Sequence, residues 1–91
     1  MRGGLGDDCL SGDRGADIVW GDQGNDSLFG GAEEDQLFGG EGGDWLYGGD
    51  DADTIFANEG DDIVFGGEGD DIIDGGAGND IIKGGDGIDT L

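Results

Sequence analysis

Histidine and proline are absent from this 91-residue chain, and cysteine occurs once, as Cys9. With no histidine and a single thiol, the side chains provide neither a zinc site nor a redox-metal site. A single cysteine also excludes an internal disulfide. We expect Cys9 to be a small, half-buried strand residue, with oxidative dimerisation as the alternative.

Basic residues are equally scarce. Three Lys and Arg stand against 24 Asp and Glu, which gives a net charge of −21. Arg2, Arg14 and Lys83 form no basic stripe for nucleic acid or acidic polysaccharide. Apolar runs fall short of the ~20 residues that cross a bilayer, and the N-terminus lacks the hydrophobic region of a signal peptide. With 25 Gly, such a chain is expected to be disordered unless something supplies positive charge and binding energy.

What the chain has instead is a repeat. Residues 66–74 read GGEGDDIID and residues 75–83 read GGAGNDIIK, both of the form Gly-Gly-x-Gly-x-Asp-x-U-x, where U is a large aliphatic residue. This frame runs without insertion through ten units, from residues 3–11 to residues 84–91, the last being one residue short. A fixed period of this kind is typical of a solenoid.

Two positions of the unit are the same in character throughout. The sixth position is always aspartate: Asp8, Asp17, Asp26, Asp35, Asp44, Asp53, Asp62, Asp71, Asp80 and Asp89. The eighth is always aliphatic: Leu10, Val19, Leu28, Leu37, Leu46, Ile55, Val64, Ile73, Ile82 and Leu91. Because side chains alternate across a strand, the eighth positions are predicted to face inward and the seventh and ninth outward.

The expected fold is therefore all-β: a parallel β-solenoid of about five coils, each made of two units. In each unit a six-residue glycine-rich turn is expected to precede a three-residue strand. Each strand then pairs in parallel with the strand two units away. The turns stack in the same way, which gives five turns and four gaps on each of two edges, or about eight gaps in all.

The gaps are predicted to bind calcium. Calcium takes six to eight oxygen ligands and accepts backbone carbonyls beside carboxylates. Two stacked turns, such as those that end at Asp71 and Asp89, together complete such a shell. Eight Ca²⁺ would bring the net charge from −21 to about −5.

Magnesium is the competitor, but it prefers ideal octahedra and resists dehydration. An EF-hand is excluded because no twelve-residue loop ends in the required glutamate.

Over essentially its whole length the chain resembles the RTX (repeats-in-toxin) family, whose nonapeptide repeats form calcium-binding parallel β-rolls in secreted bacterial toxins, metalloproteases, lipases and alginate epimerases. The resemblance implies that the fold is a right-handed parallel β-roll and that the ten aspartates are calcium ligands. It also implies export through a type I system while unfolded, and calcium-induced folding outside the cell. The family's C-terminal cap and secretion signal do not occur in residues 1–91, so we expect a single repeat segment of a larger secreted protein.

Some units depart from the pattern. Asp13 and Asp22 replace the second glycine, and we expect the turn to survive there because aspartate tolerates left-handed backbone. Glu33 and Asp51 replace the third glycine in units four and six, which are neighbours on one edge, so the gap between them is expected to bind most weakly. Ala57-Asn58 is expected to weaken both gaps beside unit seven. The strongest gap is expected between units eight and ten.

The ninth position carries an aromatic stripe. Its members sort into two ladders, Trp20, Phe38 and Phe56 on one sheet and Phe29, Tyr47 and Phe65 on the other, with Trp45 beside the second. Cross-strand stacking is the first interpretation. A docking surface for a protein partner or for self-association is the alternative.

We expect no enzyme, because the chain lacks histidine and a nucleophile–base pair, and because a narrow prism offers no cleft. Glycosidase chemistry would need two carboxylates isolated in a groove. We also expect no outward array for ice binding, since the only threonines are Thr54 and Thr90 and two residues do not make a regular array. A calcium-binding structural module is the favoured function, and a partner-binding solenoid is the alternative.

Overall fold

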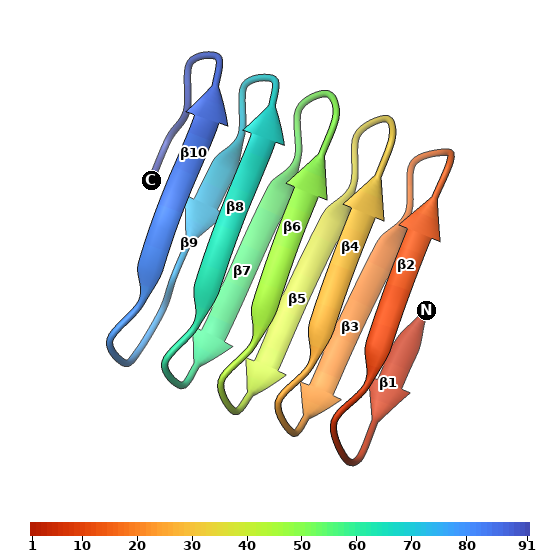
Figure 1. The fold of residues 1–91 in the computed structure, drawn as a ribbon, viewed down its shortest axis with the longest axis vertical. Helices are drawn as coiled ribbons and strands as arrows, with labels where there is room; N and C mark the ends of the chain where they lie inside the picture. The colour runs from red at the N-terminus through yellow and green to blue at the C-terminus, as the bar shows by residue number, and fades with distance from the viewer.

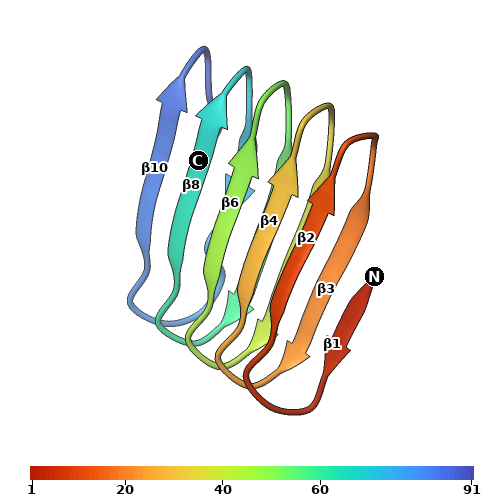
Figure 2. The same cartoon turned by 45° about the vertical axis from the view of Figure 1, so that its right-hand side comes forward.

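The computed structural model describes residues 1–91 as ten β-strands without a helix. One sheet contains β1 (Arg2–Gly4), β3 (Ile18–Gln23), β5 (Gln36–Glu41), β7 (Thr54–Glu59) and β9 (Ile72–Asp74). The other contains β2 (Cys9–Asp13), β4 (Ser27–Gly31), β6 (Trp45–Gly49), β8 (Ile63–Glu68) and β10 (Ile81–Asp86). The even strands lie side by side over the odd strands, which run the other way, and the two termini lie at opposite ends of the stack (Figures 1 and 2).

Every pairing within a sheet is parallel and joins residues 18 positions apart. Val19 pairs with Leu37, and Leu28 pairs with Leu46. This offset equals two units, so the predicted coil of two nonapeptides is confirmed. The chain forms a β-solenoid of about five turns, as a slab with extents of 32 × 27 × 12 Å. It contains no helix long and apolar enough to cross a membrane.

Most strands are longer than the predicted three residues. β8 begins at Ile63 and ends at Glu68, so it continues through the Gly-Gly pair that opens the next unit. The ladder includes these glycines, since Gly31 pairs with Gly49 and Gly49 with Gly67. The prediction of a six-residue turn is therefore wrong: the first two positions belong to the strands, and the turn is correspondingly shorter.

The core is a single layer of side chains between the sheets. Its buried aliphatic members at the eighth position are Val19, Leu28, Leu37, Leu46, Ile55, Val64 and Ile73, with Ala57 added from a first position. Leu10 and Ile82 are partly buried and pack against this cluster. Leu91 lies outside the strands, does not pack against the cluster and is 69% exposed, so the inward prediction is wrong for this residue. Cys9 is a free thiol in β2 and is exposed rather than half-buried.

The outward aromatic residues form the two predicted ladders. In the odd-strand sheet the Trp20 and Phe38 rings stack with centroids 5.7 Å apart, and Phe38 and Phe56 stack at 5.6 Å. In the even-strand sheet Phe65 is tilted against both Tyr47 and Trp45, at 6.5 and 6.4 Å. The stacking interpretation is confirmed for the first ladder. The second is less regular and leaves its rings more exposed.

The single-layer core makes one substitution diagnostic. Leu46→Ala removes a fully enclosed side chain (1% exposed), and we expect it to lower the free energy of unfolding in excess calcium by about 2–5 kcal/mol. The matched control is Leu91→Ala at the exposed end of the same stripe, for which a change within about 0.5 kcal/mol is expected. Denaturant unfolding followed by circular dichroism measures both. Equal losses for the two variants would contradict the assignment of the core.

Candidate metal centre

The turns depend on left-handed backbone at two positions of each unit, the second and the fourth. Most of these positions carry glycine, for example Gly40 and Gly42 in unit five (φ 109° and 115°). The five that do not are the departures from the repeat: Asp13 (φ 72°), Asp22 (φ 75°), Glu33 (φ 77°), Asp51 (φ 74°) and Asn58 (φ 79°). The turn therefore survives in every unit, as predicted for Asp13 and Asp22. Glu33, Asp51 and Asn58 also adopt the left-handed conformation, although it is sterically unfavourable for a residue with a Cβ.

The sixth-position aspartates form two columns along the solenoid. Asp8, Asp26, Asp44, Asp62 and Asp80 form the odd column, and Asp17, Asp35, Asp53, Asp71 and Asp89 form the even column. Within a column, each backbone N–H donates to Oδ1 of the aspartate two units later. Asp26 N–H reaches Asp44 Oδ1 at 2.8 Å, and Asp44 N–H reaches Asp62 Oδ1 at 2.7 Å. The pair predicted to share an ion, Asp71 and Asp89, is joined in this way at 3.0 Å.

The columns are buried except at their ends. Six carboxylates, those of Asp26, Asp35, Asp44, Asp53, Asp62 and Asp71, are at most 1% exposed. Asp8 and Asp17 at one end, and Asp80 and Asp89 at the other, are half-buried. The structure thus brings all ten predicted residues into the two columns.

The second carboxylate oxygen is the notable atom. Oδ2 is buried and has no hydrogen-bond partner in Asp8, Asp17, Asp26, Asp35, Asp44, Asp53, Asp62 and Asp71. These eight atoms correspond one to one with the eight gaps between stacked turns. A buried oxygen left unpaired costs free energy, and more so when it is charged. Eight repetitions of the same unpaired oxygen indicate a ligand set for cations.

Backbone carbonyls lie beside these oxygens. A methyl group built on Gly39 would lie 2.7 Å from Asp44 Oδ2 and 2.6 Å from the carbonyl oxygen of residue 57, one coil further on. Gly39 is not left-handed, so its glycine is needed for this close approach and not for its φ. The sequence analysis did not assign a role to the first-position carbonyls or to the sixth-position N–H groups. A signal for them does exist in the sequence, because glycine occupies the first position although the backbone conformation there does not require it.

Burial changes the acidity of the columns. Desolvation is the main cause that raises the pKa of Asp44 and of Asp53 to about 7, and it raises the pKa of Asp26, Asp35, Asp62 and Asp71 as well. The hydrogen bond from the neighbouring backbone N–H opposes this rise, and the charge of neighbouring acidic groups adds to it. In the absence of a cation, the fold therefore favours protonated carboxyls.

These residues fit a hard divalent cation. The structure contains no group of three or more histidine, cysteine or acidic side chains that could hold a metal ion by themselves. A cation in a gap would therefore need backbone carbonyls beside the two flanking column carboxylates. That donor set consists of oxygen atoms alone and is the one that calcium accepts.

Comparison with known proteins agrees with this chemistry. A family model described as the RTX calcium-binding nonapeptide repeat matches in four copies, at residues 2–37, 29–64, 38–73 and 56–91. Together these copies cover nearly the whole chain. No curated protein and no solved structure matches it.

The raised pKa values predict how the metal-free chain responds to acid. A carboxyl whose folded-state pKa is raised from 3.8 to about 7 stabilises the fold fully below pH 3.8. That stabilisation is lost as the pH rises through about 7. In chelator we therefore expect more strand signal at pH 5 than at pH 8, measured by far-ultraviolet circular dichroism. More strand at pH 8 than at pH 5 would contradict the burial of the columns.

Proposed function

The chain belongs to the RTX calcium-binding nonapeptide repeat family, and we propose that it is a structural module that folds when Ca²⁺ ions bind between its stacked turns. The observation that carries this proposal is the set of eight buried, unpartnered Oδ2 atoms, one for each gap. The ligands would be the ten column aspartates, with backbone carbonyls of the turns, and the array would hold up to about eight ions.

Folding is coupled to binding because the folded chain brings like charges together. The net charge is −21, and the fold stacks ten of the carboxylates in two narrow columns. Near neutral pH these groups cannot all be ionised and buried without counter-charge. Calcium supplies that charge and satisfies the unpaired oxygens, so its binding free energy becomes folding free energy.

This coupling suits a segment of an exported protein. Where calcium is scarce the chain would stay unfolded, which suits passage through a type I secretion channel. Outside the cell, where calcium is millimolar, it would fold without a disulfide. Within the module the carboxylates have a binding role and not a catalytic one, because they lie stacked beneath turns and not isolated in a groove.

The gaps would differ in affinity. Glu33 and Asp51 hold left-handed backbone at φ 77° and 74°, a conformation that costs about 1–2 kcal/mol for a residue with a Cβ. They lie in units four and six and so flank one gap, which we rank weakest. Units eight and ten carry glycine at both left-handed positions, and the gap between them ranks strongest.

Calcium-induced folding is tested by circular dichroism at pH 8 in chelator, in millimolar calcium and in millimolar magnesium. We expect strand signal with calcium alone, because the carbonyl-rich gaps serve magnesium poorly. An equally large increase in strand signal with magnesium would contradict the assignment of calcium as the bound ion. Full strand signal in chelator would contradict the coupling of folding to ion binding.

The ranking of gaps is tested by two substitutions in the same column. Asp71→Ala and Asp53→Ala both damage the gap between units six and eight. Asp71→Ala also damages the gap ranked strongest, and Asp53→Ala the gap ranked weakest. We therefore expect Asp71→Ala to raise the calcium midpoint of folding further, in a titration followed by intrinsic fluorescence. Equal midpoints would contradict the ranking.

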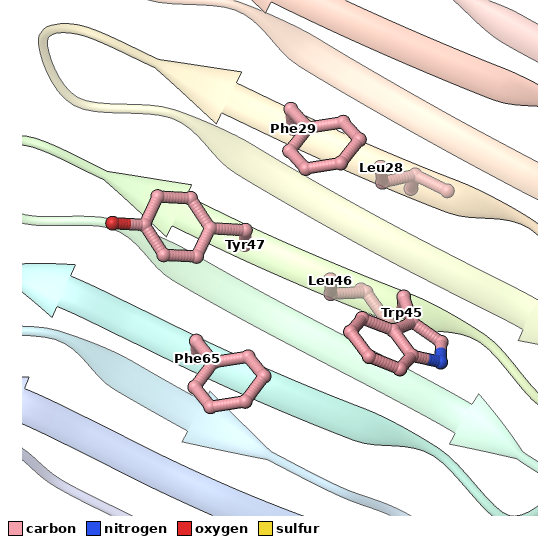
Figure 3. A pocket seen from close by; sticks show the side chains of 6 residues that line it. All are labelled: Leu28, Phe29, Trp45, Leu46, Tyr47 and Phe65. Atoms are coloured by element: carbon pink, nitrogen blue, oxygen red, sulfur yellow. The ribbon is translucent and has the colours of Figure 1, made fainter.

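A second function, self-association, is favoured by the outer face of the even-strand sheet. Phe29, Trp45, Tyr47 and Phe65, with Leu28 and Leu46 beneath, line an apolar hollow of about 300 Å³ on β4, β6 and β8 (Figure 3). Trp45 is 56% exposed. β4 and β6 contain no charged residue, and β8 carries only Glu68 at its end. A second copy can therefore approach this face while both sets of carboxylates stay at the rims, and we propose that two calcium-loaded copies pair here.

Sedimentation in calcium over a range of protein concentrations tests this pairing. We expect a concentration-dependent dimer that Trp45→Ser weakens at least tenfold, because the substitution removes a large exposed ring from the centre of the contact. Ile72→Ser is the control, since Ile72 is similarly exposed (52%) on the opposite sheet. A monomer at every concentration, or equal weakening by both variants, would contradict pairing through this face.

A further inference from the structure

Unit seven differs from the other nine at its first position. There the backbone carries Ala57, whereas every other unit has glycine. Ala57 is fully buried and is part of the aliphatic core cluster. Its methyl group is therefore enclosed in the interior of the solenoid.

The glycines at the equivalent positions show what a methyl group meets there. On Gly21 it would lie 2.5 Å from the Gly39 carbonyl oxygen and 2.7 Å from Asp26 Oδ2, and on Gly30 it would lie 2.5 Å from the Gly48 carbonyl oxygen. These distances are shorter than carbon and oxygen atoms approach without a bond. In these units the space beside the first-position Cα is therefore filled by the unpaired carboxylate oxygen and by the carbonyl oxygen of the next coil. In unit seven the equivalent space would be filled by the methyl group of Ala57.

Asp62, the aspartate of unit seven, keeps the contacts of the other buried column residues. Its Oδ2 is buried without a hydrogen-bond partner, and its backbone N–H donates to Asp80 Oδ1 at 3.0 Å. The difference at this gap is therefore the methyl group of Ala57 and not the carboxylate.

The gap on the other side of unit seven is unaffected. A methyl group on Gly39 would meet the Ala57 carbonyl oxygen at 2.6 Å and Asp44 Oδ2 at 2.7 Å, as its counterparts meet theirs in other units. The Asp44 N–H also donates to Asp62 Oδ1 at 2.7 Å. The methyl group thus acts on the gap between units seven and nine and leaves the gap between units five and seven intact.

We propose that Ala57 disables one position of the calcium array, the gap between units seven and nine, so that the chain binds one ion fewer than its repeats suggest. The methyl group occupies the space in which Asp62 Oδ2 and the Gly75 carbonyl oxygen would otherwise converge. The odd column then has three working gaps and the even column four. This inference rests on the proposed calcium-binding function.

The test counts calcium ions bound per chain by equilibrium dialysis at pH 8 with calcium as the only divalent cation. Ala57→Gly is expected to bind one ion more than the wild type and to fold at a lower calcium midpoint. The control is Ala77→Gly, because Ala77 is exposed and lies at a third position. It loses the same methyl group outside the columns and is expected to leave the count unchanged. The converse variant, Gly39→Ala, places a methyl group in the gap between units five and seven and is expected to lose one ion.

Equal counts and equal midpoints for the wild type and Ala57→Gly would overturn the inference while leaving calcium-induced folding in place. A gain of one ion by both Ala57→Gly and Ala77→Gly would overturn it too, since the effect would then not depend on the column. If Gly39→Ala fails to fold, the comparison of Ala57→Gly with the wild type decides alone. Absence of calcium binding by every variant would instead remove the proposed function itself.

Discussion

Repulsion between stacked carboxylates is the constraint on which the rest of this structure depends. Neighbours in a column lie about one strand spacing apart, ~4.8 Å. At an effective dielectric constant of about 20, two charges at that distance repel by about 3 kcal/mol. Summed over the eight gaps, this exceeds the ~5–15 kcal/mol by which a domain is normally stable. We therefore propose that the ionised columns are compatible with the fold only when cations lie between them.

The other features of the chain follow from the geometry of the columns. Left-handed positions bend each turn tightly enough to stack on its neighbour, and first-position glycines let the carboxylate oxygen approach the backbone. The core between the sheets is only one side chain deep. It sets the register of the coils, because a one-residue slip would turn the eighth positions outward. The core thus specifies which turns stack, and in the proposed function the cations would supply the free energy that keeps them stacked.

Much of this could be predicted from the nine-residue period. The period predicts the inward eighth positions from Val19 to Ile73, and together with a coil of two units it predicts the 18-residue offset between paired strands and the two columns of aspartate. Strand length was predicted wrongly, because glycine is a poor strand residue by propensity, whereas here Gly31, Gly49 and Gly67 pair with one another. Leu91 is exposed because it lies outside the sheets, although its position in the repeat is the same as that of the core residues.

The detailed contacts within the columns could not be predicted from the repeat and are seen only in the three-dimensional structure. A repeat pattern says that Asp44 and Asp62 are neighbours, but not that one backbone N–H takes Oδ1 and leaves Oδ2 unpaired. In sequence, Ala57 is one of several departures, and it was expected to weaken the gaps on both sides. The surroundings of the equivalent glycines, Gly21, Gly30 and Gly39, are the basis for assigning the effect of its methyl group to one side. Such effects depend on distances of a few tenths of an ångström, which spacing in sequence does not encode.

The most direct measurement is the radius of gyration of the chain at pH 8, by small-angle X-ray scattering, in chelator and in millimolar calcium. The folded slab has a Cα radius of gyration of 11.3 Å, whereas an unfolded chain of this length is expected at about 30 Å. The account predicts a value near that of the slab with calcium and near 30 Å in chelator. A chain as compact in chelator as in calcium would contradict it, because the carboxylate columns would then have formed without cations.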